Sequence, residues 1–155
     1  MTNDVLPVRR LEELSEEESL ELLASEQVGR LGVVVDGQPV IFPVNYVLDG
    51  RLVVFRNDPG TKLTHASLDR VCFEVDRIDA DRHDGWSVVV QGIGREITGA
   101  LDDASVRERA LGLQTWITGE KGHWVRISTP HISGRRLIPG AAEPGAAEPG
   151  AAEPA

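Results

Sequence analysis

The sequence predicts a mainly β protein with helices (α+β), built as a six-stranded antiparallel barrel that is closed or split. Three runs rich in β-branched and aromatic residues lie between positions 28 and 56, separated by Asp36-Gly37 and Asp49-Gly50. An Asp-Gly pair between two such runs is typical of a two-residue type I′ hairpin turn, so the runs should form an antiparallel meander. These turns are too short for the crossovers of a parallel sheet. A barrel also removes exposed strand edges, and an open α+β sheet is the main alternative.

Further strands are expected in the second half of the chain. They lie at 70–79, 86–99 and 124–128, with a short closing strand at 135–138. The strand at 86–99 should bend at Gly92 or Gly94, because glycine inside a strand often marks a bulge or a barrel corner. Helices are expected at 14–26 and 100–114, and a helical turn or two at 61–69. Near the start of the first helix is Ser15, which has capping-box spacing to Glu18.

Composition is that of a soluble globular protein with one domain. The chain has 155 residues, of which 41% are hydrophobic and 26% charged. Its formal net charge of −9 argues against a general nucleic-acid binder, since neutralising phosphates needs clustered Lys and Arg. No run reaches the roughly 18 apolar residues of a membrane span, and the N-terminus has no apolar leader. A single cysteine suits a reducing compartment. We therefore expect a cytoplasmic protein with neither nucleic-acid nor membrane partners.

The chain should divide into three parts. Residues 1–10 are polar and contain a proline, which predicts a flexible N-terminal arm. Residues 11–139 should form the barrel domain. Residues 140–155 repeat Gly, Ala, Glu and Pro and cannot bury an apolar surface, so a disordered tail is expected there.

The exit from the meander contains the parts of a phosphate site. Arg56 ends the third strand, a turn with the sequence NDPG follows, and Thr61 and Lys62 come next. A guanidinium, a hydroxyl and an ammonium near free backbone N–H groups suit a phosphate dianion. The alternative is that Arg56 simply ends a strand in solvent and Thr61 caps a helix.

The order of these motifs resembles the pyridoxamine 5′-phosphate oxidase-like superfamily. The similarity is carried by GRLGVVVDGQPVIFPVNYVLDGRLVVFRNDPGTK, FEVD and GWSVVVQGIGREI, and is strongest to the actinobacterial and nitroimidazole-resistance-like branch of flavin and deazaflavin proteins. The resemblance implies a split barrel of the FMN-binding type. It also implies a homodimer with two cofactor sites at the interface, most often occupied by FMN.

The resemblance further implies which residues bind the cofactor. One group would face the flavin ring, another would hold the phosphate, and a C-terminal strand would reach the site. The residues are Val44, Asn45, Tyr46, Phe55, Arg56, Thr61, Lys62, Gln91, Trp124 and Arg126. Each has a structural alternative: Asn45 can be a satisfied core amide, and Gln91 can face outward from its strand. Trp86 and Trp116 are expected to be core or interface anchors.

No catalytic residue can be assigned from the sequence. The four histidines lack metal-ligand spacing, so no metal site is expected, and Cys72 on an apolar strand should be a packed core residue. In flavoproteins the cofactor carries the redox chemistry, so the expected function is a flavin-dependent oxidoreductase acting on a small or aromatic substrate. The alternatives are a deazaflavin-, haem- or bilin-binding relative, or a flavin-binding stress module without turnover. Oxidation of pyridoxamine phosphate is doubtful because a second basic constellation is not evident, although Arg135 and Arg136 could belong to one.

Overall fold

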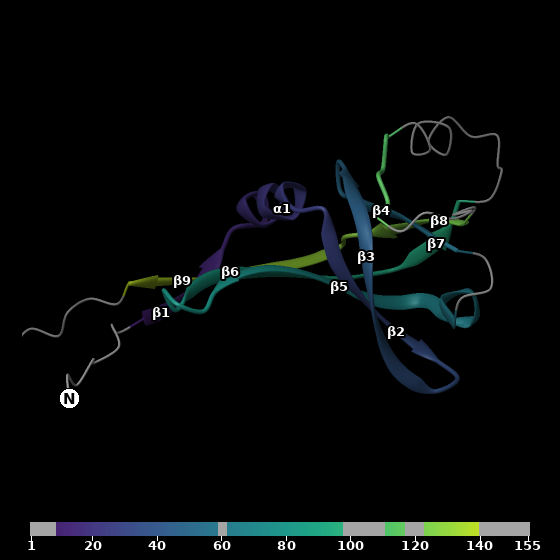
Figure 1. Ribbon diagram of the computed structural model, residues 1–155, viewed down its shortest axis with the longest axis horizontal. Coiled ribbons are helices and arrows are strands. Elements are labelled where there is room, and N and C mark those ends of the chain that lie inside the picture. Colours follow the sequence, from purple (N-terminus) through teal and green to yellow (C-terminus); the bar gives the residue numbers. More distant parts are fainter. Residues whose placement is uncertain (1–8, 59–61, 98–110, 117–122, 140–155) are drawn as a thin grey trace, which may run out of the picture.

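The computed structural model describes residues 9–58, 62–97, 111–116 and 123–139 (Figure 1). Within these residues, nine strands form one antiparallel sheet in the order β1-β9-β6-β5-β2-β3-β4-β8-β7. The sheet curls into a half-barrel, which confirms the predicted class but with nine strands where six were expected. The elements are β1 (Arg9–Leu14), α1 (Glu16–Ser25), β2 (Val28–Val35), β3 (Gln38–Asp49), β4 (Leu52–Asn57), η1 (Lys62–His65), β5 (Ser67–Asp79), β6 (Asp84–Gly92), β7 (Gly94–Glu96), β8 (His123–Ser128) and β9 (His131–Pro139).

The predicted meander is confirmed in β2, β3 and β4, but its second turn differs from the expectation. Asp36 and Gly37 form the first turn and both have positive φ, at 49° and 77°, as a type I′ turn requires. The second loop is formed by Gly50 and Arg51, because Asp49 already pairs with Leu52. Of these two loop residues only Gly50 has positive φ, at 60°, which suits a type II′ turn.

Two long segments are each divided between two halves of the sheet. The predicted bend after Gln91 is confirmed. β6 pairs with β5 and β9, the strand is interrupted at Ile93, and β7 then pairs with β8. At this interruption two segments of the chain lie so close that a Cβ atom on Gly92 would be 1.9 Å from the Ser128 carbonyl oxygen. A second interruption, at Thr129 and Pro130, likewise separates β8 from β9. The interruption at Ile93 accounts for part of the difference in strand number, because 86–99 was expected to be one strand.

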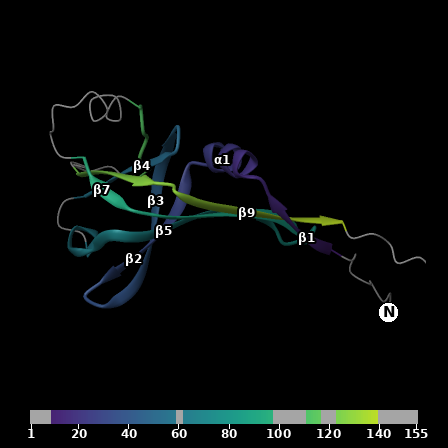
Figure 2. The same ribbon diagram turned by 180° about the vertical axis from the view of Figure 1, so that it is seen from behind.

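The two ends of the described chain extend the sheet beyond the barrel. Arg9 and Arg10, placed in the flexible arm by the sequence analysis, are the first residues of β1, which pairs with β9. β9 spans nine residues, where a short strand at 135–138 was expected. Seen from behind, β1 and β9 project away from the half-barrel beside α1 (Figure 2). β1 was not predicted because its sequence, RRLEEL, is charged and offers no strand-like apolar run.

The first helix is confirmed, the second is confirmed in part, and most of the third lies outside the described residues. Ser15 accepts a hydrogen bond from the Glu18 amide, and the Glu18 carboxylate accepts one from the Ser15 amide, completing the capping box of α1. The helical turn or two expected at 61–69 is confirmed over part of its length, because η1 is a 3-10 turn at Lys62–His65. The remainder is wrong: Ser67 already pairs with Val34 of β2, so sheet pairing overrides local propensity there. Of the helix expected at 100–114, residues 100–110 lie outside the described residues and 111–114 are not helical.

The core lies inside the curl of the sheet and under α1. Alternate residues of the strands point inward, as the buried positions Leu31, Phe73, Val88, Phe55 and Ile127 illustrate. At the end of the curl, Gly94 of β7 packs against Leu68 of β5. Among the described residues, no helix is long and apolar enough to span a bilayer.

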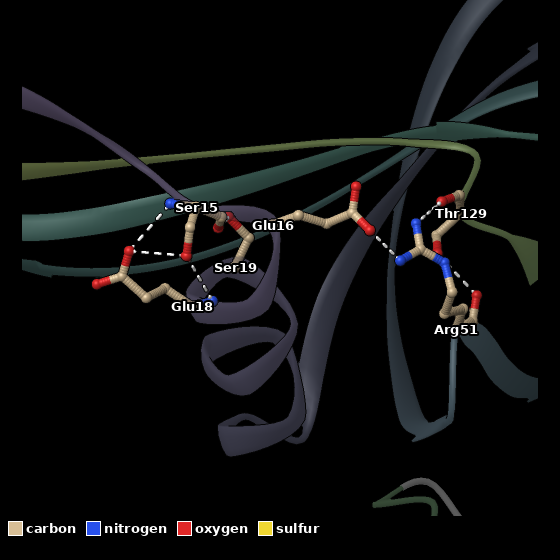
Figure 3. A network of polar contacts seen from close by, with 6 residues as sticks. All are labelled: Ser15, Glu16, Glu18, Ser19, Arg51 and Thr129. Carbon is tan, nitrogen blue, oxygen red and sulfur yellow. Dashed lines mark hydrogen bonds and ion pairs between the residues drawn. The ribbon is translucent and has the colours of Figure 1, made fainter.

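One polar network joins α1 to two corners of the half-barrel (Figure 3). Arg51, in the β3–β4 turn, forms an ion pair with Glu16 in the first turn of α1. Its guanidinium also donates to the Thr129 carbonyl at 3.0 Å, and the Thr129 hydroxyl donates to the Arg51 carbonyl at 2.8 Å. These reciprocal bonds fasten the end of the β4–β8 pair.

Replacing Thr129 by valine should lower the free energy of unfolding by about 1–2 kcal/mol. The substitution removes the hydrogen bond from the buried Thr129 hydroxyl to the Arg51 carbonyl while it keeps the shape of the side chain. Urea unfolding of Thr129→Val measures the effect. Ser133→Ala, which removes an exposed hydroxyl from β9, is the control and should change little. Equal stability of both variants and wild type would contradict this assignment.

Candidate functional site

Four of the predicted site residues share the outer face of β3, β4 and β8. In this part of the sheet Tyr46 pairs with Phe55, and Phe55 with Val125, and all three are buried. Side chains alternate along a strand, so the neighbours of these residues point to the opposite face. That face carries Asn45, Arg56, Trp124 and Arg126, each partly exposed.

The guanidinium of Arg56 lies over the indole of Trp124. The two residues pair across β4 and β8, and the distance from Cζ to the ring centroid is 4.8 Å. A cation over an aromatic face is attracted by the ring quadrupole, which orients the guanidinium. The sequence placed both residues in one site but gave no indication that they touch.

The sequence reasoning missed Arg95. It lies in β7 and pairs directly with Arg126 in β8. Like charges directly opposite each other on a sheet are unfavourable unless an anion or other partner offsets them. The only signal for Arg95 in the sequence was its place between Gly94 and Glu96, where it would point to the opposite face of a strand from both neighbours. We call the outer surface formed by Asn45, Arg56, Arg95, Trp124 and Arg126 the arginine face.

The segment 111–116 lies against one margin of the arginine face. The Trp116 amide donates a hydrogen bond of 2.9 Å to Oδ1 of Asn45. The Asn45 side-chain oxygen thus has a partner within the chain, and Asn45 lies on the outer face and not in the core. Trp116 is 71% exposed, so it is not a core anchor.

The side chains of three other predicted site residues point away from this face. Phe55 and Tyr46 are 0% and 2% exposed, and Val44 packs against the same core. The Tyr46 hydroxyl donates to the Leu23 carbonyl, and its ring meets Phe73 edge-to-face at 4.9 Å. A ligand on the outer face could reach these residues only through their backbone.

Gln91 lies on another part of the outer surface. It occupies an open groove of about 600 Å³ at the break between β6 and β7, lined by Asp69, Arg70, Val71, Cys72, Gln91, Gly92, Ile93, Pro130 and His131. Four of the predicted site residues are thus brought together, and Gln91 is separate from them. Thr61 lies outside the described residues, and Lys62 is the first residue of η1.

The expectation for Cys72 is wrong. Its thiol is exposed and lies 3.9 Å from the Gly32 carbonyl, because even-numbered residues of β5 face outward. Among the described residues, no group of three or more His, Cys, Asp or Glu side chains is placed to hold a metal ion. His123 lies 3.7 Å from Glu96 beside the arginine face.

Comparison with known proteins establishes the family. The family model for pyridoxamine 5′-phosphate oxidase matches residues 15–136. The chain belongs to this family. An uncharacterised protein of Mycobacterium tuberculosis is 34% identical over 137 residues, which are 84% of this chain and 88% of that protein.

Two solved structures extend this pyridoxamine 5′-phosphate oxidase relationship to the fold. An FAD-binding protein of Mycobacterium smegmatis is 35% identical, with a TM-score of 0.61, over 82% of this chain and 98% of that one. A candidate pyridoxamine 5′-phosphate oxidase of Corynebacterium glutamicum is 32% identical, with a TM-score of 0.70, over 84% of this chain and 99% of that one. The fold is therefore the split barrel that the sequence predicted.

Tyr46 gives a direct test of the inward orientation because it is the only tyrosine in the chain. Burial, and then the charge of Glu26, raises its pKa above the ordinary 10.0. The folded state therefore holds the phenol proton more tightly than the unfolded chain. This stabilisation is complete below about pH 10 and is lost as the pH rises above it.

In an alkaline titration, phenolate absorbance should appear together with the loss of the folded circular dichroism signal, and not before it. Tyr46→Phe should weaken the decline of stability above about pH 10. The variant should lower the unfolding free energy at neutral pH by about 1 kcal/mol, since the Leu23 carbonyl loses its donor. Ionisation near pH 10 in the folded protein would contradict the buried position.

Proposed function

We propose that this protein is a flavin-binding oxidoreductase that holds FMN with its phosphate end at the arginine face. The observation that carries the proposal is the Arg56 guanidinium held over Trp124, with Arg126 and Arg95 paired beside it. The chain as a whole has a net charge of −9, so three arginines on adjacent strands are a local exception.

The residues of the arginine face fit a phosphate-bearing cofactor. Guanidinium groups bind phosphate oxygens through paired N–H donors and stay charged at any physiological pH. Arg56 and Arg126 would hold the phosphate, and Lys62 stays a proposed contributor from the sequence. Trp124 orients Arg56 and offers an aromatic surface. Bound flavin would supply the redox chemistry, while the protein positions it and tunes its electronics.

The choice of flavin rests on the relatives. A protein 35% identical to this chain is an FAD-binding protein, and so is one from Mesorhizobium loti that is 25% identical. We propose FMN, the flavin that the family resemblance implies most often and whose single phosphate the arginines could bind. FAD, deazaflavin, haem and bilin are the competing ligands, and a flavin-binding module without turnover is the competing function.

The substrate is proposed to be small or aromatic. Oxidation of pyridoxamine phosphate itself is disfavoured. Arg136, a candidate for a second basic constellation, lies 3.9 Å from Glu18 and pairs with Glu12 in the extension of the sheet. Arg135 pairs with Glu13 beside it. Neither belongs to the arginine face. A cytoplasmic location stays a prediction from the sequence.

We further propose that the protein is a homodimer, built through the outer face of β2 and β3. Ile41 is 70% exposed and Val34 47% exposed on this face, and Pro39 and Pro43 are also exposed there. Adjacent exposed apolar side chains on a sheet are typical of an interface. A second copy of the chain would bury them.

The proposed cofactor is tested by the absorbance spectrum of the purified protein and by mass analysis of what denaturation releases. A yellow protein that releases FMN is expected. Release of FAD would show that the cofactor is FAD and not FMN. Release of a deazaflavin, a haem or a bilin would overturn the flavin proposal. Oxidation of NAD(P)H or reduced deazaflavin by the loaded protein separates an enzyme from a binding module.

Arg56→Ala should weaken FMN binding at least tenfold in a fluorescence titration, because a charged hydrogen bond to phosphate contributes about 1.5–3 kcal/mol. Arg56→Lys should recover part of the affinity, since it keeps the charge but not the planar fork. Arg10→Ala removes the same charge from β1 and serves as the control. If Arg56→Ala and the control bind FMN equally tightly, the proposed phosphate site is wrong.

Ile41→Glu should convert dimers to monomers in light scattering, because a carboxylate would be buried without a partner at the interface. Ile78→Glu is the matched control: Ile78 is 62% exposed near the β5–β6 hairpin, away from this face. A wild-type monomer, or an Ile41→Glu protein that stays dimeric, would refute the interface.

A further inference from the structure

A small pocket lies where α1 ends and β2 begins. It has a volume of about 270 Å³ and is lined by Ser25, Glu26, Gln27, Val28 and Trp116. This volume is just below the range of about 300–1,000 Å³ that holds drug-sized ligands, so the pocket suits a smaller molecule. Among the described residues, its lining includes neither the arginines of the arginine face nor any residue of the groove around Gln91. The proposed flavin site therefore does not use this pocket.

One wall of the pocket is the indole of Trp116. This side chain is 71% exposed, although large aromatic side chains usually pack against the protein. The backbone beneath it is held in place, because the Trp116 amide donates a hydrogen bond of 2.9 Å to Oδ1 of Asn45. The electron-rich face of an indole attracts cations more strongly than the other aromatic rings do. Trp116 therefore offers a positioned aromatic surface that is largely open to solvent.

The carboxylate of Glu26 gives the pocket a negative charge. Its Oε1 atom is buried and forms an ion pair with Arg77, yet among the described residues it accepts no hydrogen bond. A buried carboxylate oxygen without a hydrogen-bond donor is unfavourable, so Glu26 has the capacity to accept one from a ligand. Arg77 does not cancel this charge, because its side chain is 67% exposed and exposed ion pairs contribute little.

The end of α1 adds to the negative potential at the pocket. The helix ends at Ser25, has Glu26 as its C-cap and carries no basic residue in its last turn. The C-terminal end of a helix has a partial negative charge, which stabilises a nearby cation. In the part of the chain that the structure describes, no lysine or arginine lines the pocket. The aromatic face, the carboxylate and the helix end all favour a positively charged ligand.

We propose that this pocket binds a small organic ammonium ion, with its charged nitrogen between the Trp116 indole and the Glu26 carboxylate. The N–H groups of a protonated primary amine would satisfy the acceptor capacity of Glu26, and its alkyl part would contact Val28. The inference goes beyond the proposed function, because it assigns a second ligand to the protein and does not require bound flavin.

The first test titrates the purified protein with butylammonium, and separately with its neutral counterpart 1-butanol, in ligand-observed NMR experiments. Butylammonium is very small, so a dissociation constant of about 1 mM is expected. 1-Butanol has the same size without the charge and should bind at least about tenfold more weakly. The indole N–H resonance of Trp116, assigned by its absence in Trp116→Phe, should shift when butylammonium is added.

The second test removes each binding group in turn. Glu26→Gln should weaken butylammonium binding about fivefold, because it removes the charge and keeps the shape. Glu21→Gln removes the same charge from an exposed position of α1 outside the pocket, so it is the control and should bind like wild type. Trp116→Ala should weaken binding about threefold, and Trp116→Phe should recover part of the affinity by restoring an aromatic face. Circular dichroism checks that every variant stays folded.

The outcomes separate a specific site from a general attraction of cations to an acidic protein. The net charge is −9, so butylammonium could gather near the surface without a site. In that case Glu26→Gln and Glu21→Gln would have equal effects, and this result would overturn the proposal. Equal affinity for butylammonium and 1-butanol, or an unchanged Trp116 resonance, would overturn it as well. Because these titrations do not involve flavin, none of the outcomes bears on the proposed FMN site.

Discussion

Gly92 and the Ser128 carbonyl approach each other closely where the two halves of the sheet meet. A side chain at position 92 would lie 1.9 Å from that oxygen, so the two segments can cross only with glycine there. The crossing lets the segment after Asp84 pair with β5 and β9 in its first half and with β8 in its second. This division of the segment between β6 and β7 lets one part of the sheet curl into the half-barrel while the other part extends to β9 and β1.

The same crossing shapes the arginine face and the groove around Gln91. Beyond it, β7 lies beside β8 and places Arg95 opposite Arg126. Before it, the separation of β6 from β7 opens the groove that contains Gln91. Arg51 and Thr129 fasten the adjacent corner, so the end of the β4–β8 pair is fixed by hydrogen bonds as well as by packing. The opposite end of that pair carries Arg56 and Trp124.

The electrostatic character of the arginine face is local. An acidic protein repels anions at long range, but at physiological salt such fields are screened beyond about 8 Å. Binding of a phosphate would then depend on the few arginines that it touches. An arginine oriented by an aromatic ring loses less freedom when it binds than a mobile one. Arg56 is the clearest case.

Elements that depend on local chemistry can be predicted from neighbouring residues alone. The Ser15–Glu18 capping box, the Asp36-Gly37 turn and the glycine bend after Gln91 were all predicted, because each is specified by residues close together in the chain. The family was predicted from the order of the motifs, and the match to residues 15–136 confirms it.

Pairing between distant strands determines which of the predicted residues come together. β1 and the start of β5 are strands because distant partners pair with them, against their local propensity. Strand register turned Tyr46 and Phe55 into the core, turned Arg56 outward onto Trp124, and brought the unexpected Arg95 beside Arg126. A shift of one residue would reverse these faces, and the register depends on pairing between segments that lie far apart in the sequence.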